Sequence, residues 1–164
     1  MEEIMKTWRS LAAKQKEKTR LFLKRLKPKD EKKIDALVND LHDRAFERID
    51  CLQCANCCKT LSPIVKTPDI ERIASHLRLK QSDFINRYVK IDEDGDYVFN
   101  STPCPFLAED NYCSIYDVRP RDCRDYPHTQ KQGFVRRLHV NAENTVSCPA
   151  VFHIVEELKK VGSF

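Results

Sequence analysis

Residues 51–58 read Cys51-Leu52-Gln53-Cys54-Ala55-Asn56-Cys57-Cys58, so that cysteine occupies four of eight positions. The first three cysteines recur every third residue, a spacing that lets several sulfurs converge on one ion from a tight loop. Cys57 and Cys58 are adjacent, and successive side chains of an extended chain point to opposite sides. We therefore expect this pair either to serve two different sites or to leave one sulfur as a reactive thiol.

Four further cysteines lie in the second half of the chain, each beside turn or helix-start residues rather than inside an apolar run. Eight thiols match two tetrahedral sets of four. The alternative, a thiol packed in the core, fits best at Cys58 and Cys113. We predict that all eight cysteines bind metal: Cys51, Cys54, Cys57, Cys58, Cys104, Cys113, Cys123 and Cys148.

The spacing and the number of cysteines favour different metals. C-x2-C-x2-C with a distant Cys148-Pro149 pair is the arrangement of bacterial ferredoxins, which favours iron and a 4Fe-4S cluster. Eight thiolates, in contrast, divide into two four-cysteine zinc sites. The sequence therefore leaves zinc and iron open as the bound metal.

The composition indicates a globular protein, because 41 % of the 164 residues are hydrophobic and 33 % are charged. No segment approaches the ~18 uninterrupted apolar residues of a membrane span, and the N-terminus lacks the apolar run of a signal peptide. We therefore expect a cytoplasmic protein without a membrane span. Disulfides would explain the cysteines poorly in that reducing compartment, whereas metal binding explains them well.

Helices are predicted near both ends of the chain. Residues 2–26 have apolar residues at both ends and a polar middle, typical of an exposed helix that docks by its ends or of a partly frayed arm. Pro28 is expected to end this helix, and Asp30 to begin a second one with a continuous apolar stripe. The last helix is expected to begin at Cys148-Pro149.

The elements between these helices are shorter. Residues 51–58 are expected on a tight loop directly after the second helix. The other predicted elements are a helix capped by Thr67 that runs to about Arg78, a helix capped by Ser82, a hairpin turning at 92–95, a helical turn around Cys123 and a strand at 134–140.

These elements predict an α+β, mainly helical fold, in which a small, irregular, cysteine-rich metal-binding domain follows an N-terminal helical pair. The expected division is a basic helical segment over residues 1–49 and a zinc- or iron-chelating domain over residues 50–164.

Several motifs accompany the cysteine segment: Asp69-Ile70, Arg72-Ile73-Ala74, Phe84 to Tyr88, Pro103-Cys104-Pro105-Phe106-Leu107, Cys113-Ser114-Ile115-Tyr116, Arg119-Pro120, Cys123-Arg124 and Tyr126-Pro127. Together they resemble the CxxCxxCC cysteine-cluster family of bacterial proteins over residues 51–149. The resemblance implies that the matching cysteines chelate zinc or iron. Ala55 stands where members commonly have glycine, so the loop either avoids a positive φ there or tolerates strain.

A flagellin lysine methylase carries a similar cysteine cluster, but that resemblance is partial. This chain has only three glycines and no glycine-rich loop for a nucleotide or methyl donor.

Three arginines surround Cys123 in the sequence. Arg119 and Arg124 belong to the matched motifs, and we predict that they support the metal or cluster by hydrogen-bonding thiolates or by offsetting negative charge. Arg121 fits a solvated helical face equally well.

Basic residues concentrate near the N-terminus, where residues 1–33 hold twelve Lys or Arg and five Asp or Glu. This segment lacks interleaved aromatic residues and a recognisable reading helix, so it is interpreted as a solvated helix rather than a nucleic-acid binding arm. The leading function is therefore binding of a metal or cluster. The alternatives are a cluster-dependent enzyme with redox or lysine-methylation-like chemistry, and a structural zinc domain that contacts a protein partner.

Overall fold

The computed structural model describes residues 2–26 and 30–161, with side chains from Thr7 onward. The chain folds into two compact units, a terminal unit of Met1–Asp50 with Pro127–Phe164 and a central unit of Cys51–Tyr126. One boundary between these units lies between Asp50 and Cys51, and the predicted division after residue 49 stays a prediction. The C-terminal helices, however, pack with the N-terminal ones, because their apolar faces meet in a shared core. That residues 50–164 act as one chelating domain stays a prediction.

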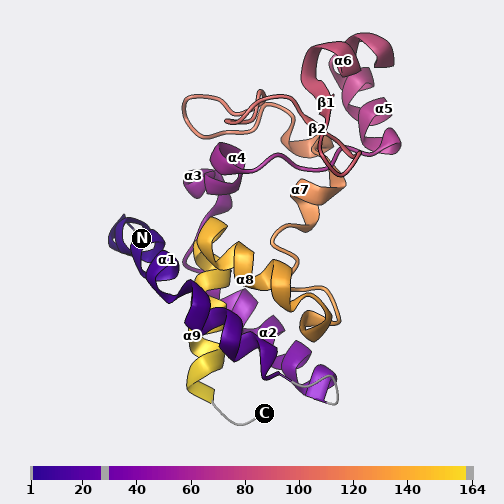
Figure 1. Ribbon diagram of the computed structural model, residues 1–164. Coiled ribbons are helices and arrows are strands. Elements are labelled where there is room, and N and C mark those ends of the chain that lie inside the picture. The colour runs from indigo at the N-terminus through magenta and orange to yellow at the C-terminus, as the bar shows by residue number, and fades with distance from the viewer. Residues whose placement is uncertain (1, 27–29, 162–164) are drawn as a thin grey trace. The chain divides into compact units, whose positions relative to one another are not determined.

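The terminal unit is built on α9 (Pro149–Val161), which packs against α1 (Glu2–Lys24), α2 (Glu31–Phe46) and α8 (Leu138–Ser147) (Figure 1). Proline at the first position of α9 suits a helix start, because its missing N–H would have no intrahelical partner there. The predicted apolar face of α9 is confirmed by its buried residues: Val151, Ile154, Val155 and Leu158.

Helix α1 docks along its length. Trp8 and Ala12 pack on Phe152, and Leu23 is fully buried near the other end. In the polar middle Thr19 is also buried, and its hydroxyl oxygen accepts a hydrogen bond from Lys159 Nζ at 2.8 Å. We predicted that the helix docks by its ends, but its middle also contacts the rest of the unit. Pro28, predicted to end it, lies outside the described residues.

Helix α2 confirms the predicted apolar stripe, because Ile34, Val38 and Leu41 are buried at spacings of three and four residues. Asp30 is its N-cap, as predicted, although its side chain makes no capping hydrogen bond.

The strand predicted at 134–140 is wrong. This segment forms the 3₁₀ helix η3 (Phe134–Arg136) and the start of α8. The backbone N–H groups of Gly133 and Phe134 donate to the Asp35 carboxylate at 2.7 and 2.9 Å. Because a side chain of α2 satisfies these donors, the segment does not need a strand neighbour.

The central unit contains six helices among its described residues and one hairpin (Figure 1). The helices are α3 (Cys51–Cys54), α4 (Asn56–Thr60), α5 (Thr67–His76), α6 (Gln81–Tyr88), the 3₁₀ helix η2 (Tyr116–Val118) and α7 (Arg121–Asp125). Strands β1 (Val89–Ile91) and β2 (Tyr97–Phe99) pair antiparallel, with Val89 opposite Phe99. The hairpin and the helical turn around Cys123 are thus confirmed, as is the mainly helical α+β fold.

The core of the central unit lies between α5, α6 and the hairpin. Its largest fully buried side chains are Ile73, Phe84, Phe99 and Ile115, and Phe106 packs against two of these rings. Cys104 and Cys113 are partly buried against the same cluster. Two of the candidate ligands are therefore held by an apolar core as well as by their own loops.

Two local predictions in this unit are corrected. Residues 51–58 form the short helices α3 and α4 instead of a tight loop. Helix α5 is capped at Lys66 instead of Thr67, since the Asp69 carboxylate reaches back to accept from the Lys66 backbone N–H at 3.1 Å. Helix α6 similarly begins after Lys80 instead of Ser82.

Within the described parts of the chain, none of the helices combines the length and the apolar character that crossing a membrane requires.

Candidate metal centre

The first group of cysteines lies on the two consecutive helical turns α3 and α4. Cys51 and Cys54 are the first and last residues of α3, and Cys57 and Cys58 lie within α4. Between the helices Ala55 has left-handed backbone angles, φ 45° and ψ 19°, and its side chain is buried. Of the two outcomes expected at Ala55, the structure shows the positive φ.

Cys57 and Cys58 bring their sulfurs to 4.0 Å from each other. A hydrogen bond with the Cys57 thiol lowers the pKa of the Cys58 thiol to about 7, and the charge of Lys59 acts in the same direction, while burial opposes both. Cys58 therefore ionises more readily than an ordinary cysteine and is suited to be a thiolate ligand.

Three later cysteines gather around Cys58. The backbone N–H of Cys104 donates to the Cys58 carbonyl oxygen at 2.8 Å. The Leu107 backbone N–H donates to the Cys104 carbonyl oxygen at 3.1 Å. Leu107 also forms an antiparallel bridge with Cys113, so Cys113 lies across a turn from Cys104. Cys123 lies on α7. We refer to Cys58, Cys104, Cys113 and Cys123 as the four-cysteine set.

The charges of these four thiols act on one another's pKa values. Burial and the charges of Cys58 and Cys113 raise the pKa of Cys104 to about 11. Burial and the charge of Cys58 raise the pKa of Cys113 as well. The pKa of Cys123 rises through burial and through the charges of the other three cysteines and of Asp122. Four thiolates would repel one another strongly here, and a bound cation would remove that repulsion.

Arg119 and Arg124 differ in what the structure shows of them. The Arg119 guanidinium lies 3.9 Å from the centre of the Tyr116 ring, and its charge lowers the pKa of Cys113, against the larger effect of burial. Its predicted role in offsetting the negative charge of the thiolates stays a prediction. Arg124 follows Cys123 on α7 and donates its backbone N–H to the Pro120 carbonyl. Its predicted role in supporting the metal stays a prediction.

The other four predicted ligands are not members of the four-cysteine set, although Cys57 directly precedes Cys58. Cys51, Cys54 and Cys57 keep the C-x2-C-x2-C spacing on α3 and α4, whereas Cys148 belongs to the terminal unit, at the junction of α8 and α9. All eight cysteines are among the described residues, and none forms a disulfide. Across residues 2–26 and 30–161, no three His, Cys, Asp or Glu side chains already stand in a geometry that holds a metal ion.

Two acidic residues make hydrogen bonds near Cys123 that the sequence did not predict. Asp122 Oδ2 accepts from the backbone N–H of Ile64 at 3.3 Å, and Asp69 Oδ1 accepts from the backbone N–H of Arg121 at 3.1 Å. Both bonds bind α7 to the segment that follows Cys58. Asp69 was noted only as part of a motif, and no local pattern reveals a hydrogen bond to a residue 52 positions away.

Comparisons with known proteins place the chain in a family. The model of the CxxCxxCC family, described as "Putative zinc- or iron-chelating domain", matches residues 50–149. An uncharacterized protein of Methanocaldococcus jannaschii is 32 % identical over 82 residues, which are 48 % of this chain and 44 % of that protein. The chain therefore spans less than half the length of this relative. No solved structure matches the chain.

Proposed function

Since the chain belongs to the CxxCxxCC family, whose model covers residues 50–149, we propose that it binds zinc or iron through cysteine thiolates of its central unit. The observation that carries this proposal is the four-cysteine set, in which residues from three separate segments share one electrostatic environment. Four thiolates suit both a tetrahedral zinc ion and a 4Fe-4S cluster.

The chemistry of the set supports chelation over a cluster of buried thiols. The four thiols raise one another's pKa values only as thiolates, and a divalent cation stabilises the thiolate form of each ligand. Zinc with four thiolates would carry a net charge of about −2, and Arg119 is placed to offset part of that charge.

Cys57 and Cys58 support a division of the cysteines between two sites. Cys58 belongs to the four-cysteine set, while Cys57 shares the regular spacing of Cys51 and Cys54. We therefore assign Cys51, Cys54 and Cys57 to a second thiolate group. Cys148 stays a predicted ligand on the sequence pattern alone.

The decisive experiment is elemental analysis and visible absorbance of the same anaerobically purified sample. Zinc in a colourless protein would identify zinc as the metal, whereas iron with acid-labile sulfide and the broad visible absorption of a cluster would identify a 4Fe-4S centre. Protein that holds neither zinc nor iron, and takes up neither after reduction and reconstitution, would refute the proposed function.

Paired substitutions test the division between the two thiolate groups. Cys104→Ser with Cys123→Ser should remove the metal of the four-cysteine set and leave any metal of the other group. Cys51→Ser with Cys54→Ser should do the reverse. If both pairs abolish the same single ion, the division is wrong and the cysteines form one site.

The result also bears on the two other functions that the sequence leaves open. Stoichiometric zinc without any redox change favours a structural domain that presents a surface to a protein partner. A cluster that can be reduced reversibly favours an enzyme with redox or methyl-transfer chemistry. Either function fits a reducing cytoplasmic location, where thiolates stay available for metal.

A further inference from the structure

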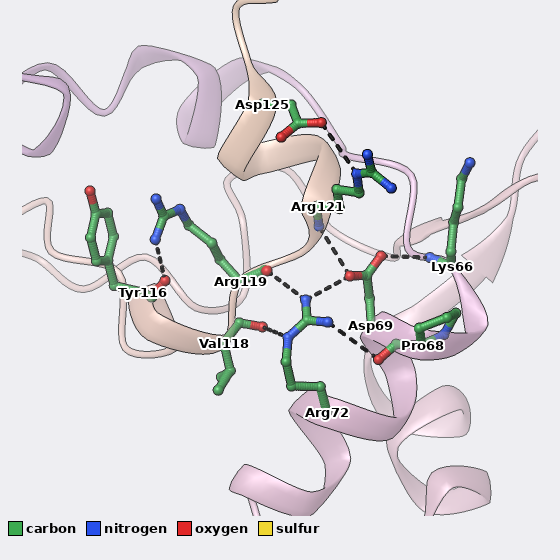
Figure 2. Close-up of polar contacts among 9 residues, drawn as sticks. All are labelled: Lys66, Pro68, Asp69, Arg72, Tyr116, Val118, Arg119, Arg121 and Asp125. Atoms are coloured by element: carbon green, nitrogen blue, oxygen red, sulfur yellow. Dashed lines mark hydrogen bonds and ion pairs between the residues drawn. The ribbon is translucent and has the colours of Figure 1, made fainter.

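A buried carboxylate organises the contacts between α5 and the segment that leads to Cys123 (Figure 2). Asp69 is only 3 % exposed. Its Oδ2 accepts from the backbone N–H of Lys66 at 3.1 Å, and its Oδ1 accepts from Arg72 Nη2 at 2.6 Å and from the backbone N–H of Arg121 at 3.1 Å. One side chain therefore binds the start of its own helix and the start of α7 together.

Arg72 extends the same network along the chain that enters α7 (Figure 2). Its Nε donates to the Val118 carbonyl at 3.3 Å, and its Nη2 donates to the Arg119 carbonyl at 2.8 Å. The guanidinium thus spans two successive carbonyl groups while it is paired with Asp69. We call Asp69 and Arg72 the α5 clasp.

The α5 clasp provides the hydrogen-bond acceptor that the N-terminus of α7 lacks. The N-cap of α7 is Pro120, whose side chain provides no capping hydrogen bond. The first helical N–H, that of Arg121, receives its acceptor from Asp69 on another helix. A helix of five residues is too short to be stable by itself, because it cannot recover the cost of nucleation. The position of α7 therefore depends on the clasp and on the bond between Asp122 and Ile64.

Cys123 lies in the middle of this dependent helix, two residues after Arg121. The other three members of the four-cysteine set are held differently, because Cys104 is hydrogen-bonded to the Cys58 backbone and Cys113 is bound by the turn at Leu107. A displacement of α7 would hence move Cys123 away while Cys58, Cys104 and Cys113 stay together.

We propose that Asp69 and Arg72 are positioning residues that hold Cys123 in place as the fourth thiolate of the metal site. This inference rests on the proposed function. Without the clasp, the set presents three thiolates, and metal should bind more weakly and with a non-sulfur fourth ligand. Loss of such supporting contacts around metal ligands typically costs about 10- to 100-fold in affinity.

The test is a titration of the reduced, metal-free full chain with Co²⁺, whose visible and near-ultraviolet spectrum reports how many thiolates bind. Wild type should show the spectrum of a four-thiolate tetrahedral site. Arg72→Met, which keeps the apolar length of the side chain, should give the three-thiolate spectrum of Cys123→Ser and a similar loss of affinity. Arg121→Ala is the control, because it removes an exposed side chain and keeps the backbone N–H that Asp69 accepts from.

A double-mutant cycle separates positioning from a general loss of stability. If Arg72 acts through Cys123, Arg72→Met in the Cys123→Ser background should cause no further loss of Co²⁺ affinity. If Arg72 merely stabilises the central unit, the two losses should multiply. Multiplying losses would overturn the inference.

Arg72→Lys covers the case in which Arg72→Met does not fold. Lysine preserves the charge beside Asp69 but cannot span two carbonyl groups with a fork, so it should also lose the fourth thiolate. A four-thiolate spectrum with wild-type affinity in Arg72→Lys would show that the two hydrogen bonds of the Arg72 guanidinium to carbonyl groups are not needed. Wild type that shows no thiolate binding of Co²⁺ would instead refute the proposed function, and the role of the clasp with it.

Discussion

Ala55 has a left-handed backbone conformation, which is unusual for a residue with a Cβ and has an energetic cost. The left-handed backbone at φ 45° costs a residue with a Cβ about 1–2 kcal/mol. The methyl group is 3 % exposed, and burying it returns about 0.8 kcal/mol. Burial of the methyl group offsets part of the cost of the left-handed backbone, which explains how alanine can occupy a position that suits glycine.

Smaller and larger side chains at Ala55 should therefore change the free energy of unfolding by unequal amounts. Ala55→Gly relieves the strain but loses the buried methyl and adds chain entropy to the unfolded state, so the free energy of unfolding should change by less than about 1 kcal/mol. Ala55→Val adds a β-branched side chain at a positive φ and should cost about 2 kcal/mol or more. Urea unfolding of metal-loaded protein measures both. Equal destabilisation by glycine and valine would show that the backbone strain is negligible.

The cysteine pKa values predict how metal binding depends on pH. In the metal-free protein at pH 7, Cys104, with a pKa of about 11, is protonated, as are Cys113 and Cys123, whose pKa values are also raised. Each must lose its proton to bind metal. About three protons should therefore be released for each ion bound at the four-cysteine set, and the affinity should rise with pH.

Calorimetric titration in buffers of different ionisation enthalpy measures this proton release. Cys58 should contribute less than one proton, because its pKa of about 7 leaves it partly ionised already. Release of fewer than two protons would mean that the raised pKa values do not hold in solution or that fewer cysteines bind.

At the scale of secondary structure elements, short helices in both units take their caps from side chains elsewhere in the chain. Asp69 provides an acceptor at the start of α7, and Asp35 of α2 does the same at η3, where it accepts from two successive backbone N–H groups. Such caps connect elements that are 52 and 99 residues apart. They explain why very short helices keep fixed positions in this protein.

Removal of the Asp35 cap should destabilise the terminal unit. Asp35→Ala leaves two backbone N–H groups without their charged acceptor, and each such hydrogen bond contributes about 1.5–3 kcal/mol. If the two contributions add, the expected loss in the free energy of unfolding is about 3–6 kcal/mol. Fluorescence of Trp8, the only tryptophan, reports unfolding of the unit in which it is buried.

Glu31→Gln provides the matched control for Asp35→Ala. It breaks the ion pair between Glu31 and Arg136 on the same two elements, but the arginine side chain is 75 % exposed. Exposed ion pairs contribute little, so the control should unfold close to wild type. A control that unfolds as early as Asp35→Ala would show that Asp35 has no special role.

At the scale of the whole molecule, the two units are stabilised by different means. The terminal unit buries the apolar faces of four helices: α1, α2, α8 and α9. In the central unit the cysteines lie on helices of four or five residues and on irregular loops. Metal binding should therefore contribute to folding mainly in the central unit, because metal affinity is gained only by the folded site.

Removal of metal by a chelator under reducing conditions should affect the units unequally. Hydrogen exchange should accelerate in α3, α4, residues 100–115 and α7, while α2 and α9 keep their protection. Trp8 fluorescence should stay that of the folded protein. Mass spectrometry of exchanged peptides makes the measurement. Equal loss of protection in both units, or no change in either, would contradict a metal-stabilised central unit.

The sequence by itself determined the elements whose residues interact locally. The 3.6-residue apolar period of α2 and α9, the proline that begins α9 and the acidic turn of the hairpin all act within a few residues. The regular cysteine spacing likewise indicated chelation, and the family match agrees with it.

Only the tertiary structure decided which cysteines share an environment and where α8 belongs. Cys58, Cys104, Cys113 and Cys123 lie on segments whose paths are set by a core and by hydrogen bonds between distant residues. The segment 134–140 became helical because Asp35, far earlier in the chain, accepts from its backbone. Contacts of this kind depend on chain closure over long distances, and no local periodicity encodes them.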